Sequence, residues 1–353
     1  MSKKKALVIC PGRGTYNKPE LGYLERHHSN RSEMLDIFEQ ERQTRSQPSL
    51  KSLDGAERYS VATHTRGDNA SLLIHACAMG DFQAIDRDRY EIAAITGNSM
   101  GWYIALACAG AVDQVDGANI VNSMGAYMQE TMIGGQIVYP LVDDDWRAIP
   151  ERRAEVLSLM ARVNEHPDQE IHISIELGGM IVLAGNDAGI KAITDLLPII
   201  DRFPMSLANH AGFHTSLQRP ISERALSTLP ATMMTRPTIP MIDGRGTIWQ
   251  PASVDHLALH QYTLGQQVTD AYNFTRAVQV GVLEFAPDCI IILGPGNTLG
   301  GAVAQSLIDI NWQCLNSKAA FAERQATNPY ILAMGHEDQR ALVTGTGDEG
   351  VKP

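Results

Sequence analysis

The sequence predicts an α/β fold in two parts: a large α/β domain and a small βαββαβ subdomain inserted into it. Two observations support this prediction. Compact apolar runs at Lys5–Cys10 and Ile92–Ile95 each end in a glycine-containing turn, and the second leads into an apolar helix, as in one half of an α/β layer. The segment from about 134 to 203 then follows the order strand, helix, strand, strand, helix, strand.

The first part of the large domain is assigned from local signals. The turn Pro11–Gly14 ends the first strand, and a polar, charged stretch follows it. Asp68 or Asn69 can cap the helix that comes next. The expected elements are a surface helix at 32–45, a loop at 46–55, a helix from 68 or 69 to about 85, and a buried helix at 102–109.

The inserted segment contains the glycine pair Gly178-Gly179 between two apolar runs, which is a good signal for a β-hairpin. A long charged helix precedes the hairpin and a shorter helix follows it, so the order is ferredoxin-like. The expected elements are a strand at 136–142, a helix at 145–164, strands at 171–176 and 180–184, a helix at 188–197 and a strand near 201–205.

The chain then returns to the large domain. We expect helices at 253–261 and 266–280, a strand at 289–293 and a helix at 297–310. After Trp312 no period is strong, and this tail is interpreted as an extra strand or a loose segment. The predicted domains are residues 1–132 with 207–312 for the large domain, 133–206 for the ferredoxin-like subdomain and 313–353 for a C-terminal extension.

Composition and charge exclude several functions. The net charge of −11 argues against general nucleic-acid binding. Five dispersed cysteines without a CxxC pair indicate a reducing compartment rather than a disulfide framework or a metal site. The apolar run after Lys3–Lys5 is too short for a secretory signal or a membrane span. We therefore expect a cytoplasmic protein that binds neither nucleic acid nor membrane.

A candidate nucleophile lies in Gly97-Asn98-Ser99-Met100-Gly101, between a strand and a helix. Glycines on both sides allow a strained turn that projects the serine hydroxyl at the helix N-terminus, as in a nucleophile elbow. There the free N–H of Met100 and the helix dipole can stabilise an oxyanion. Serine needs a base to take its proton. The candidate base is His214, in the small-residue loop 211–216, whereas the other histidines give no decisive local signal.

Taken in chain order over about residues 5–310, these motifs resemble the malonyl-CoA:acyl carrier protein transacylase family, which includes acyltransferase domains of polyketide synthases. Pro11–Gly14 is similar to the family's PGQG, Gly97–Gly101 to its GHSLG, and Gly294–Gly301 to its closing GPGxxLxG. The other matches are Met128-Gln129 with the MQ pair, 178–185 with the PGQVVIAG hairpin, 212–215 with the xFHS histidine motif and Gln261 with the RQ pair.

The resemblance implies a large α/β-hydrolase-like domain with the ferredoxin-like insert, and a two-step acyl transfer in a cleft between them. Ser99 attacks an acyl-CoA thioester while His214, oriented by Gln261, takes its proton. The backbone N–H groups of Arg13 and Met100 hold the oxyanion. The phosphopantetheine thiol of an acyl carrier protein then accepts the acyl group. No metal or redox cofactor is needed.

One departure from the family pattern bears on the acyl group. Malonyl-using members carry an arginine in Arg-Gly-x-x-Met-Gln that pairs the free malonyl carboxylate, and here Met124 holds that position. An unpaired buried carboxylate costs on the order of 3–5 kcal/mol, or roughly 10²–10³ in affinity. We therefore expect an uncharged acyl group. The alternatives are a shifted alignment or a substitute arginine, for which Arg13 is the candidate because it replaces a family glutamine.

Further positions are assigned to the substrate pocket. Asn98 replaces the elbow histidine of the family, and Trp102 replaces a glutamate and either narrows the pocket or belongs to the core. Phe213 is retained, which in the family accompanies unbranched acyl groups. The predicted pocket residues are Asn98, Trp102, Met124, Met128 and Phe213.

Two other functions remain open from the sequence. The first is an acyl hydrolase of the same fold that clears acyl chains from carrier proteins, because such relatives also tend to lack the malonyl-pairing arginine. The second is a non-catalytic docking subunit, against which the retained Ser99, His214 and Gln261 argue. An ordinary α/β-hydrolase is disfavoured because it has no place for the ferredoxin-like insert.

Overall fold

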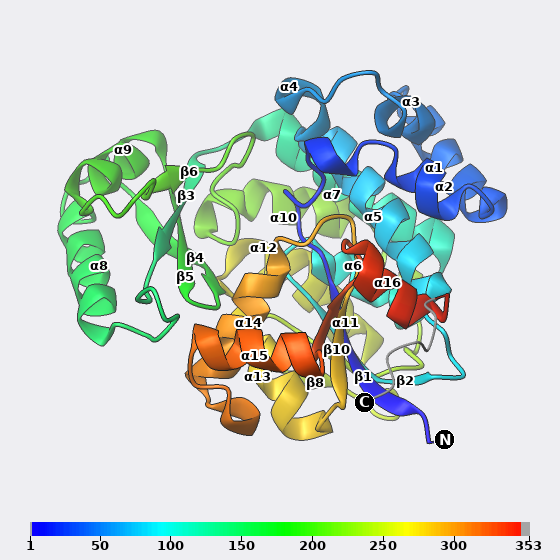
Figure 1. Ribbon diagram of the computed structural model, residues 1–353. Helices are drawn as coiled ribbons and strands as arrows, with labels where there is room; N and C mark the ends of the chain where they lie inside the picture. Colours follow the sequence, from blue (N-terminus) through cyan, green and yellow to red (C-terminus); the bar gives the residue numbers. More distant parts are fainter. Residues whose placement is uncertain (1, 347–353) are drawn as a thin grey trace.

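The structure, a computed structural model that describes residues 2–346, contains two β-sheets with helices packed around them (Figure 1). The large sheet has the strand order β11-β10-β1-β2-β7-β8, and all of its neighbours pair in parallel except β7 and β8. Its strands are β1 (Lys4–Cys10), β2 (Tyr90–Gly97), β7 (Met241–Ile242), β8 (Ile248–Trp249), β10 (Cys289–Ile292) and β11 (Ile331–Ala333).

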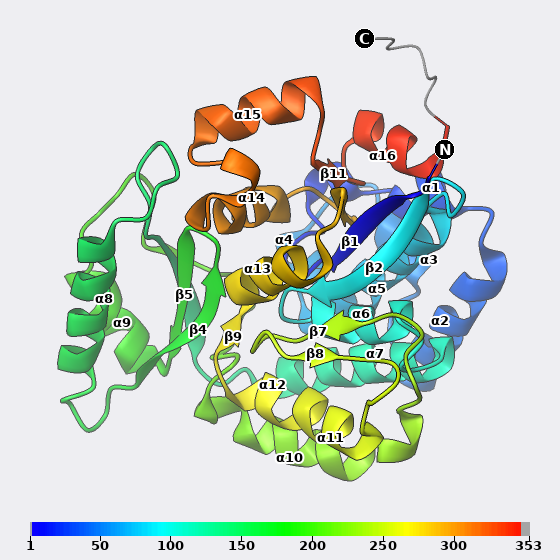
Figure 2. The same cartoon turned by 90° about the horizontal axis from the view of Figure 1, so that it is seen from below.

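The centre of the large sheet is β1, whose residues from Ala6 to Cys10 are fully buried. A strand covered on both faces reads as a continuous apolar run, which is why this segment was recognisable in the sequence. Figure 2 shows α5, α6 and α7 on one side of β1 and β2, and α14, α15 and α16 on the other. This arrangement confirms the predicted α/β class.

The helices of the large part are, in chain order, α1 (Tyr23–His28), α2 (Ser32–Thr44), α3 (Leu50–Asp54), α4 (Val61–His64), α5 (Gly67–Ala84), α6 (Gly101–Cys108), α7 (Gln114–Thr131), α10 (Arg219–Thr228), α11 (His256–Gln261), α12 (Gln267–Thr269), α13 (Phe274–Phe285), α14 (Leu299–Asp309), α15 (Lys318–Thr327) and α16 (Glu337–Thr344). The expected loop at 46–55 thus contains a short helix, α3, whose N-terminus Ser49 caps by accepting a hydrogen bond from the Ser52 N–H.

The second sheet has the order β6-β3-β5-β4-β9 and carries α8 and α9 on one face (Figure 1). It has its own apolar core, separate from that of the large sheet. The elements follow the ferredoxin-like order that the sequence predicts. They are β3 (Gly135–Pro140), α8 (Pro150–Val163), β4 (Ile171–Leu177), β5 (Met180–Gly185), α9 (Asp187–Leu196) and β6 (Met205–Ser206), joined at the edge by β9 (Tyr272–Asn273).

The predicted continuous helix at 266–280 is wrong. A π-helical turn at Tyr262–Gln266 continues into α12, the chain becomes extended at Asp270, and α13 begins only at Phe274. The interruption forms β9, which pairs with β4 of the small sheet through the partners Ile175 and Tyr272 (Figure 2). Tertiary strand pairing therefore overrides the helical period of this segment.

Two smaller predictions are also corrected. The charged helix expected from 145 begins at Pro150, because the chain turns back on itself before it and Val142 pairs with Ala148 as an isolated bridge. The strand expected near 201–205 is only Met205–Ser206. Of the two interpretations of the tail after 312, the extra strand is confirmed: β11 pairs with β10 at the edge of the large sheet. The exact domain boundaries stay a prediction.

No helix in the described part of the chain is both long enough and apolar enough to cross a bilayer.

Candidate active site

The elbow that carries Ser99 joins the end of β2 to the start of α6. Ser99 has φ of 54°, a left-handed conformation that is uncommon for a residue with a side chain. The two positions that flank the elbow must be glycine because neither has room for a Cβ atom. A Cβ on Gly97 would lie 2.2 Å from the Gly101 carbonyl oxygen, and a Cβ on Gly101 would lie 2.4 Å from the Cys10 carbonyl oxygen. Only glycine allows this close approach of β1, β2 and α6.

Ser99 and His214, which are 115 residues apart in the chain, lie within hydrogen-bond distance. The Ser99 Oγ is 2.7 Å from the His214 Nε2. His214 lies in the loop between β6 and α10, and its Nδ1 is 2.6 Å from the backbone oxygen of Gln267. A carbonyl can only accept, so Nδ1 carries the proton and Nε2 is left as the acceptor for the serine hydroxyl. A serine nucleophile and its base require this geometry.

The environment of His214 keeps its ring neutral. Burial lowers the pKa of His214 to about 4, while the hydrogen bond to the Gln267 carbonyl acts in the opposite direction. The imidazole is therefore unprotonated at neutral pH, the state in which it can take a proton from Ser99.

The glutamine at the site is Gln267 rather than Gln261. Gln267 orients His214 through its backbone oxygen, donates from Nε2 to the Ser99 carbonyl at 3.0 Å, and accepts from the Tyr103 hydroxyl at 2.8 Å. Gln261 is exposed at the end of α11, in a separate surface hollow beside Arg245 and Trp249. The assignment of Gln261 to the site is therefore corrected; the pair Gln266-Gln267 was the sequence signal that could have located the right residue.

The two residues predicted to hold the oxyanion line the cavity at the nucleophile. Arg13 follows β1 and Met100 follows Ser99, and both residues line the same cavity as Ser99. Neither backbone N–H donates to any residue in the described range 2–346. Two unused donors next to a serine hydroxyl are what an oxyanion hole needs. That role for Arg13 and Met100 remains a prediction.

A cavity of ≈ 340 Å³ opens at Ser99 between the two sheets. Four of the five predicted pocket residues line it: Asn98, Met124, Met128 and Phe213. Its walls are mainly aliphatic and aromatic, with β3, β4 and β5 supplying Val138, Ile175 and Val182 from the small sheet. Within residues 2–346, no cluster of three or more histidine, cysteine or acidic side chains could hold a metal ion.

Trp102 does not line this cavity, so its assignment to the pocket is wrong and the alternative that the sequence left open, a position in the core, is confirmed. Its side chain is fully buried in the large core, where the indole N–H donates to the Thr263 hydroxyl at 3.0 Å and the ring packs edge-on against Tyr262. Successive side chains on a helix point in different directions. Trp102, in the first turn of α6, therefore points into the large core and not toward the cavity.

The side chain of Arg13 also enters the cavity. Its guanidinium donates to the Asn209 carbonyl and stacks over the Phe213 ring, with 4.8 Å from Cζ to the ring centroid. Burial lowers the pKa of Arg13 to about 10, partly offset by the nearby Asp68 carboxylate. Asp68 itself is engaged by Arg66. Arg13 therefore links the loop after β1 to the loop that carries His214.

The structure adds three polar residues that the sequence did not single out. His210 lines the cavity, and its Nδ1 is 2.8 Å from the Gln136 Oε1. Gln136 Nε2 donates to the Ser174 hydroxyl at 2.6 Å, and Ser174 donates to the Phe213 carbonyl at 2.8 Å. The small sheet thus holds the histidine loop through a buried polar chain. Strand residues with isolated Gln and Ser give no signal of this kind in a sequence.

Two curated proteins of similar sequence share one name. No family model matches the sequence. The chain is 26% identical over 239 residues to the malonyl CoA-acyl carrier protein transacylase of Haemophilus influenzae, covering 64% of this chain and 69% of that protein. It is 23% identical over 261 residues to the transacylase of the same name from Synechocystis, covering 72% and 82% respectively.

Solved structures share the fold over nearly the whole chain. The malonyl-CoA:acyl carrier protein transacylase of Xanthomonas oryzae superposes with a TM-score of 0.74 at 19% identity, covering 98% of this chain and 99% of that one. A malonyl-transacylase in complex with a type II polyketide synthase acyl-carrier protein also gives 0.74, at 16% identity and covering 98% and 100%.

A serine on an elbow with a histidine within hydrogen-bond distance is the arrangement that a serine-dependent acyltransferase requires, and the two relatives of similar sequence are named as transacylases. The chain is a homologue of the malonyl-CoA:acyl carrier protein transacylases, which confirms the family that its motifs indicate.

Proposed function

We propose that this protein transfers an acyl group from coenzyme A to the phosphopantetheine thiol of an acyl carrier protein, through an acyl-Ser99 intermediate. The observation that supports it most directly is the 2.7 Å contact between Ser99 Oγ and His214 Nε2 at the mouth of an apolar cavity. The names of the relatives point to the same donor and acceptor.

In the first half-reaction, Ser99 Oγ attacks the thioester carbonyl carbon while its proton moves to His214 Nε2. The Arg13 and Met100 N–H groups stabilise the negative oxygen of the tetrahedral intermediate. The carbon–sulfur bond then breaks, and His214 returns the proton to the leaving coenzyme A thiolate. The product is a serine ester whose acyl chain occupies the cavity.

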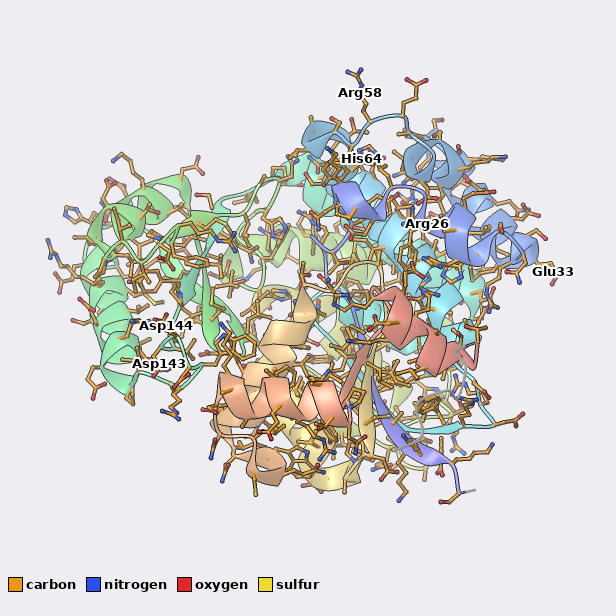
Figure 3. The ribbon with its side chains drawn as sticks, in the orientation of Figure 1. Arg26, Glu33, Arg58, His64, Asp143 and Asp144 are labelled. Atoms are coloured by element: carbon orange, nitrogen blue, oxygen red, sulfur yellow. The ribbon has the colours of Figure 1, made fainter. Side chains whose placement is uncertain are left out.

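In the second half-reaction, the carrier thiol gives its proton to His214 and attacks the carbonyl carbon of the serine ester. The carbon–oxygen bond to Ser99 then breaks, and His214 returns the proton to the Ser99 Oγ. Carrier proteins are acidic, so the approach of one to a chain of charge −11 requires locally positive surface. The loop with Asp143 and Asp144 is exposed and repels an acidic partner, whereas exposed arginines such as Arg58 attract it; Figure 3 shows these groups far apart on the molecule.

For the acyl group, we favour an uncharged chain. Met124 is buried in the cavity wall, at the position that the motif resemblance equates with the malonyl-pairing arginine, and most of the remaining wall is apolar. The competing hypothesis assigns that pairing role to Arg13. Against it, the Arg13 guanidinium already donates to the Asn209 carbonyl and stacks on Phe213.

The test is transfer of radiolabelled acyl groups from coenzyme A to a holo acyl carrier protein. We expect label on the carrier from acetyl-CoA or longer monocarboxylic thioesters, and a rate from malonyl-CoA that is lower by roughly 10²-fold or more. Efficient malonyl transfer would refute the uncharged chain. Release of free acid from acyl-carrier protein, without transfer, would favour the hydrolase, and a Ser99→Ala variant with full biological activity would favour the docking subunit.

A further inference from the structure

His210 presents an unused hydrogen-bond acceptor to the acyl cavity. The orientation of its ring follows from a chain of bonds that begins at a fixed acceptor. The Phe213 carbonyl accepts from the Ser174 hydroxyl, so the Ser174 oxygen accepts from the Gln136 Nε2. The Gln136 amide is thereby oriented, and its Oε1 accepts from His210 Nδ1 at 2.8 Å. The proton of the neutral His210 ring is therefore on Nδ1, and Nε2 carries a lone pair.

The His210 ring is also neutral. Burial, the Arg13 guanidinium and the neighbouring His214 all lower the pKa of His210 well below its usual value. Its Nε2 has no hydrogen-bond partner among residues 2–346, and the residue lines the cavity that opens at Ser99. A neutral imidazole with a bare Nε2 accepts hydrogen bonds and cannot donate from that atom.

The Arg13 side chain packs beside the same part of the cavity wall as His210. Its Nε is buried and makes no hydrogen bond within the described chain. Arg13 and His210 pack against the same ring: the guanidinium carbon is 4.8 Å, and the imidazole centroid 5.7 Å, from the centroid of Phe213. Because the Arg13 Nε is sealed from the cavity, the polar group that the cavity offers to an acyl chain here is His210 Nε2, in walls that are otherwise mainly apolar.

We propose that this cavity selects short acyl groups that bear a hydroxyl, which donates to His210 Nε2. The inference rests on the proposed acyl transfer and narrows its substrate class. A hydroxyl can donate, so it satisfies the Nε2 lone pair. A plain alkyl chain leaves that lone pair unpaired, and a carboxylate, which only accepts, has no proton to offer it. A hydrogen bond of ordinary strength discriminates by about tenfold.

The experiment measures the rate of acyl-Ser99 formation by intact mass with butyryl-CoA, 2-hydroxybutyryl-CoA, 3-hydroxybutyryl-CoA and malonyl-CoA. We expect one of the two hydroxyacyl thioesters to exceed butyryl-CoA by about tenfold or more in kcat/KM for acylation. In His210→Phe, that ratio falls to about one. In Ser174→Ala, which frees the Gln136 amide to turn, the ratio also falls.

The outcomes distinguish a failure of the hydroxyl preference from a failure of the proposed acyl transfer. Acylation of Ser99 by butyryl-CoA and both hydroxyacyl thioesters at equal rates overturns the hydroxyl preference and leaves acyl transfer intact. Fastest acylation by malonyl-CoA, lost in Arg13→Gln, overturns it in favour of carboxylate binding. No acylation by any thioester overturns both.

A measurement on the unaltered protein covers the case in which the variants do not fold. Long-range ¹H–¹⁵N spectra of histidine-labelled protein at pH 7 should show His210 as the neutral tautomer protonated on Nδ1. A ring protonated on Nε2, or on both nitrogens, contradicts the proposal because no acceptor then faces the acyl group.

Discussion

Ser99 and His214 both have left-handed backbone conformations, with φ of 54° and 57°. Such residues cost of order 1–3 kcal/mol each and persist only where their surroundings impose them. Here the surroundings are bonds to backbone groups: Gln267 Nε2 donates to the Ser99 carbonyl, and the Gln267 carbonyl accepts from His214. One residue therefore holds both members of the pair, and strain is concentrated where the chemistry is expected.

The first prediction compares the two glutamines. Gln267→Ala removes the bond to the Ser99 carbonyl and leaves the buried Tyr103 hydroxyl unpaired, so we expect a loss of about 1–3 kcal/mol in the free energy of unfolding and slower acylation. Gln261→Ala, on the exposed end of α11, should change the stability by less than about 0.5 kcal/mol and leave acylation as it is. Urea unfolding and acylation rates measure both. Equal effects in the two variants would contradict the assignment of Gln267.

The second prediction concerns pH. His214 must be neutral to accept the serine proton, and burial lowers its pKa to about 4. The rate of acylation should therefore stay constant from pH 8 down to about pH 5 and fall to half near pH 4, as His214 becomes protonated. An unshifted imidazole would give the half-point near 6.5. The measurement is the acylation rate in quenched assays across this pH range, with circular dichroism at each pH to exclude unfolding. It decides whether the half-point lies near pH 4 or near pH 6.5.

The sequence predicted the two reactive side chains of the site but not the residues that hold them in place. Ser99 and His214 lie in short local patterns that motif reading detects. The partner of His214 is a backbone carbonyl, which every residue possesses, so no side-chain pattern marks it. Trp102 was misplaced because the elbow motif does not tell which face of α6 turns toward the cavity. His210, Gln136 and Ser174 meet only through the packing of the insert against the histidine loop.

At the scale of elements, the site depends on one close crossing and one interrupted helix. The crossing brings β1, β2 and α6 together at Gly97 and Gly101. The interruption between α12 and α13 matters because a carbonyl within a continuous helix is already bonded to the N–H four residues later. The helix ends at Thr269, so the carbonyl of Gln267 is free to accept from His214.

The third prediction tests the crossing with a matched pair of substitutions. Gly101→Ala places a Cβ 2.4 Å from the Cys10 carbonyl oxygen and 2.9 Å from that of Pro11. We expect a loss of about 1–3 kcal/mol or more in stability, and a fall of about 10²-fold in acylation because the elbow shifts. Gly300→Ala, in α14, meets no atom within 4 Å and should stabilise by about 0.5–1 kcal/mol. A harmless Gly101→Ala would show that the elbow tolerates displacement.

At the scale of the whole molecule, a buried polar cluster joins distant parts of the chain. Asp81 on α5 accepts from His28 at 2.9 Å, from Tyr23 at 2.8 Å and from the Gly294 N–H at 2.7 Å, and it also pairs with Arg340 on α16. Burial acts to raise the pKa of Asp81, but the bonds from His28, Arg340 and Tyr23 outweigh it and lower the pKa. The carboxylate is therefore charged and fully paired in the core.

The fourth prediction follows from this pairing. Arg340→Met leaves the Asp81 carboxylate buried without its cation, so we expect a loss of about 3–5 kcal/mol in the free energy of unfolding. Lys191→Met, which removes a fully exposed ion pair with Asp195, should leave the denaturation midpoint unchanged. Guanidinium unfolding of both variants is the measurement. A small effect of Arg340→Met would mean that α16 is not held to the rest of the molecule by this pair.

The structure of the C-terminal segment 312–346 could not be predicted in detail from the sequence. Residues 312–346 lack a strong apolar period because β11 is a short edge strand and α15 has no buried residue. Their order comes from long-range contacts, such as β11 with β10 and Arg340 with Asp81. By contrast, β1, β2 and the ferredoxin-like insert carry their own apolar patterns, and for this reason the α/β class and the order of the insert were predictable.

The most direct test of the central claim is intact mass spectrometry of the protein after incubation with a panel of acyl-CoA thioesters, followed by peptide mapping. We predict a mass increase of one acyl group on Ser99, its absence in Ser99→Ala, and formation slower by about 10²–10⁴-fold in His214→Ala. An unmodified protein with every thioester, or equal acylation of Ser99→Ala, would contradict the account.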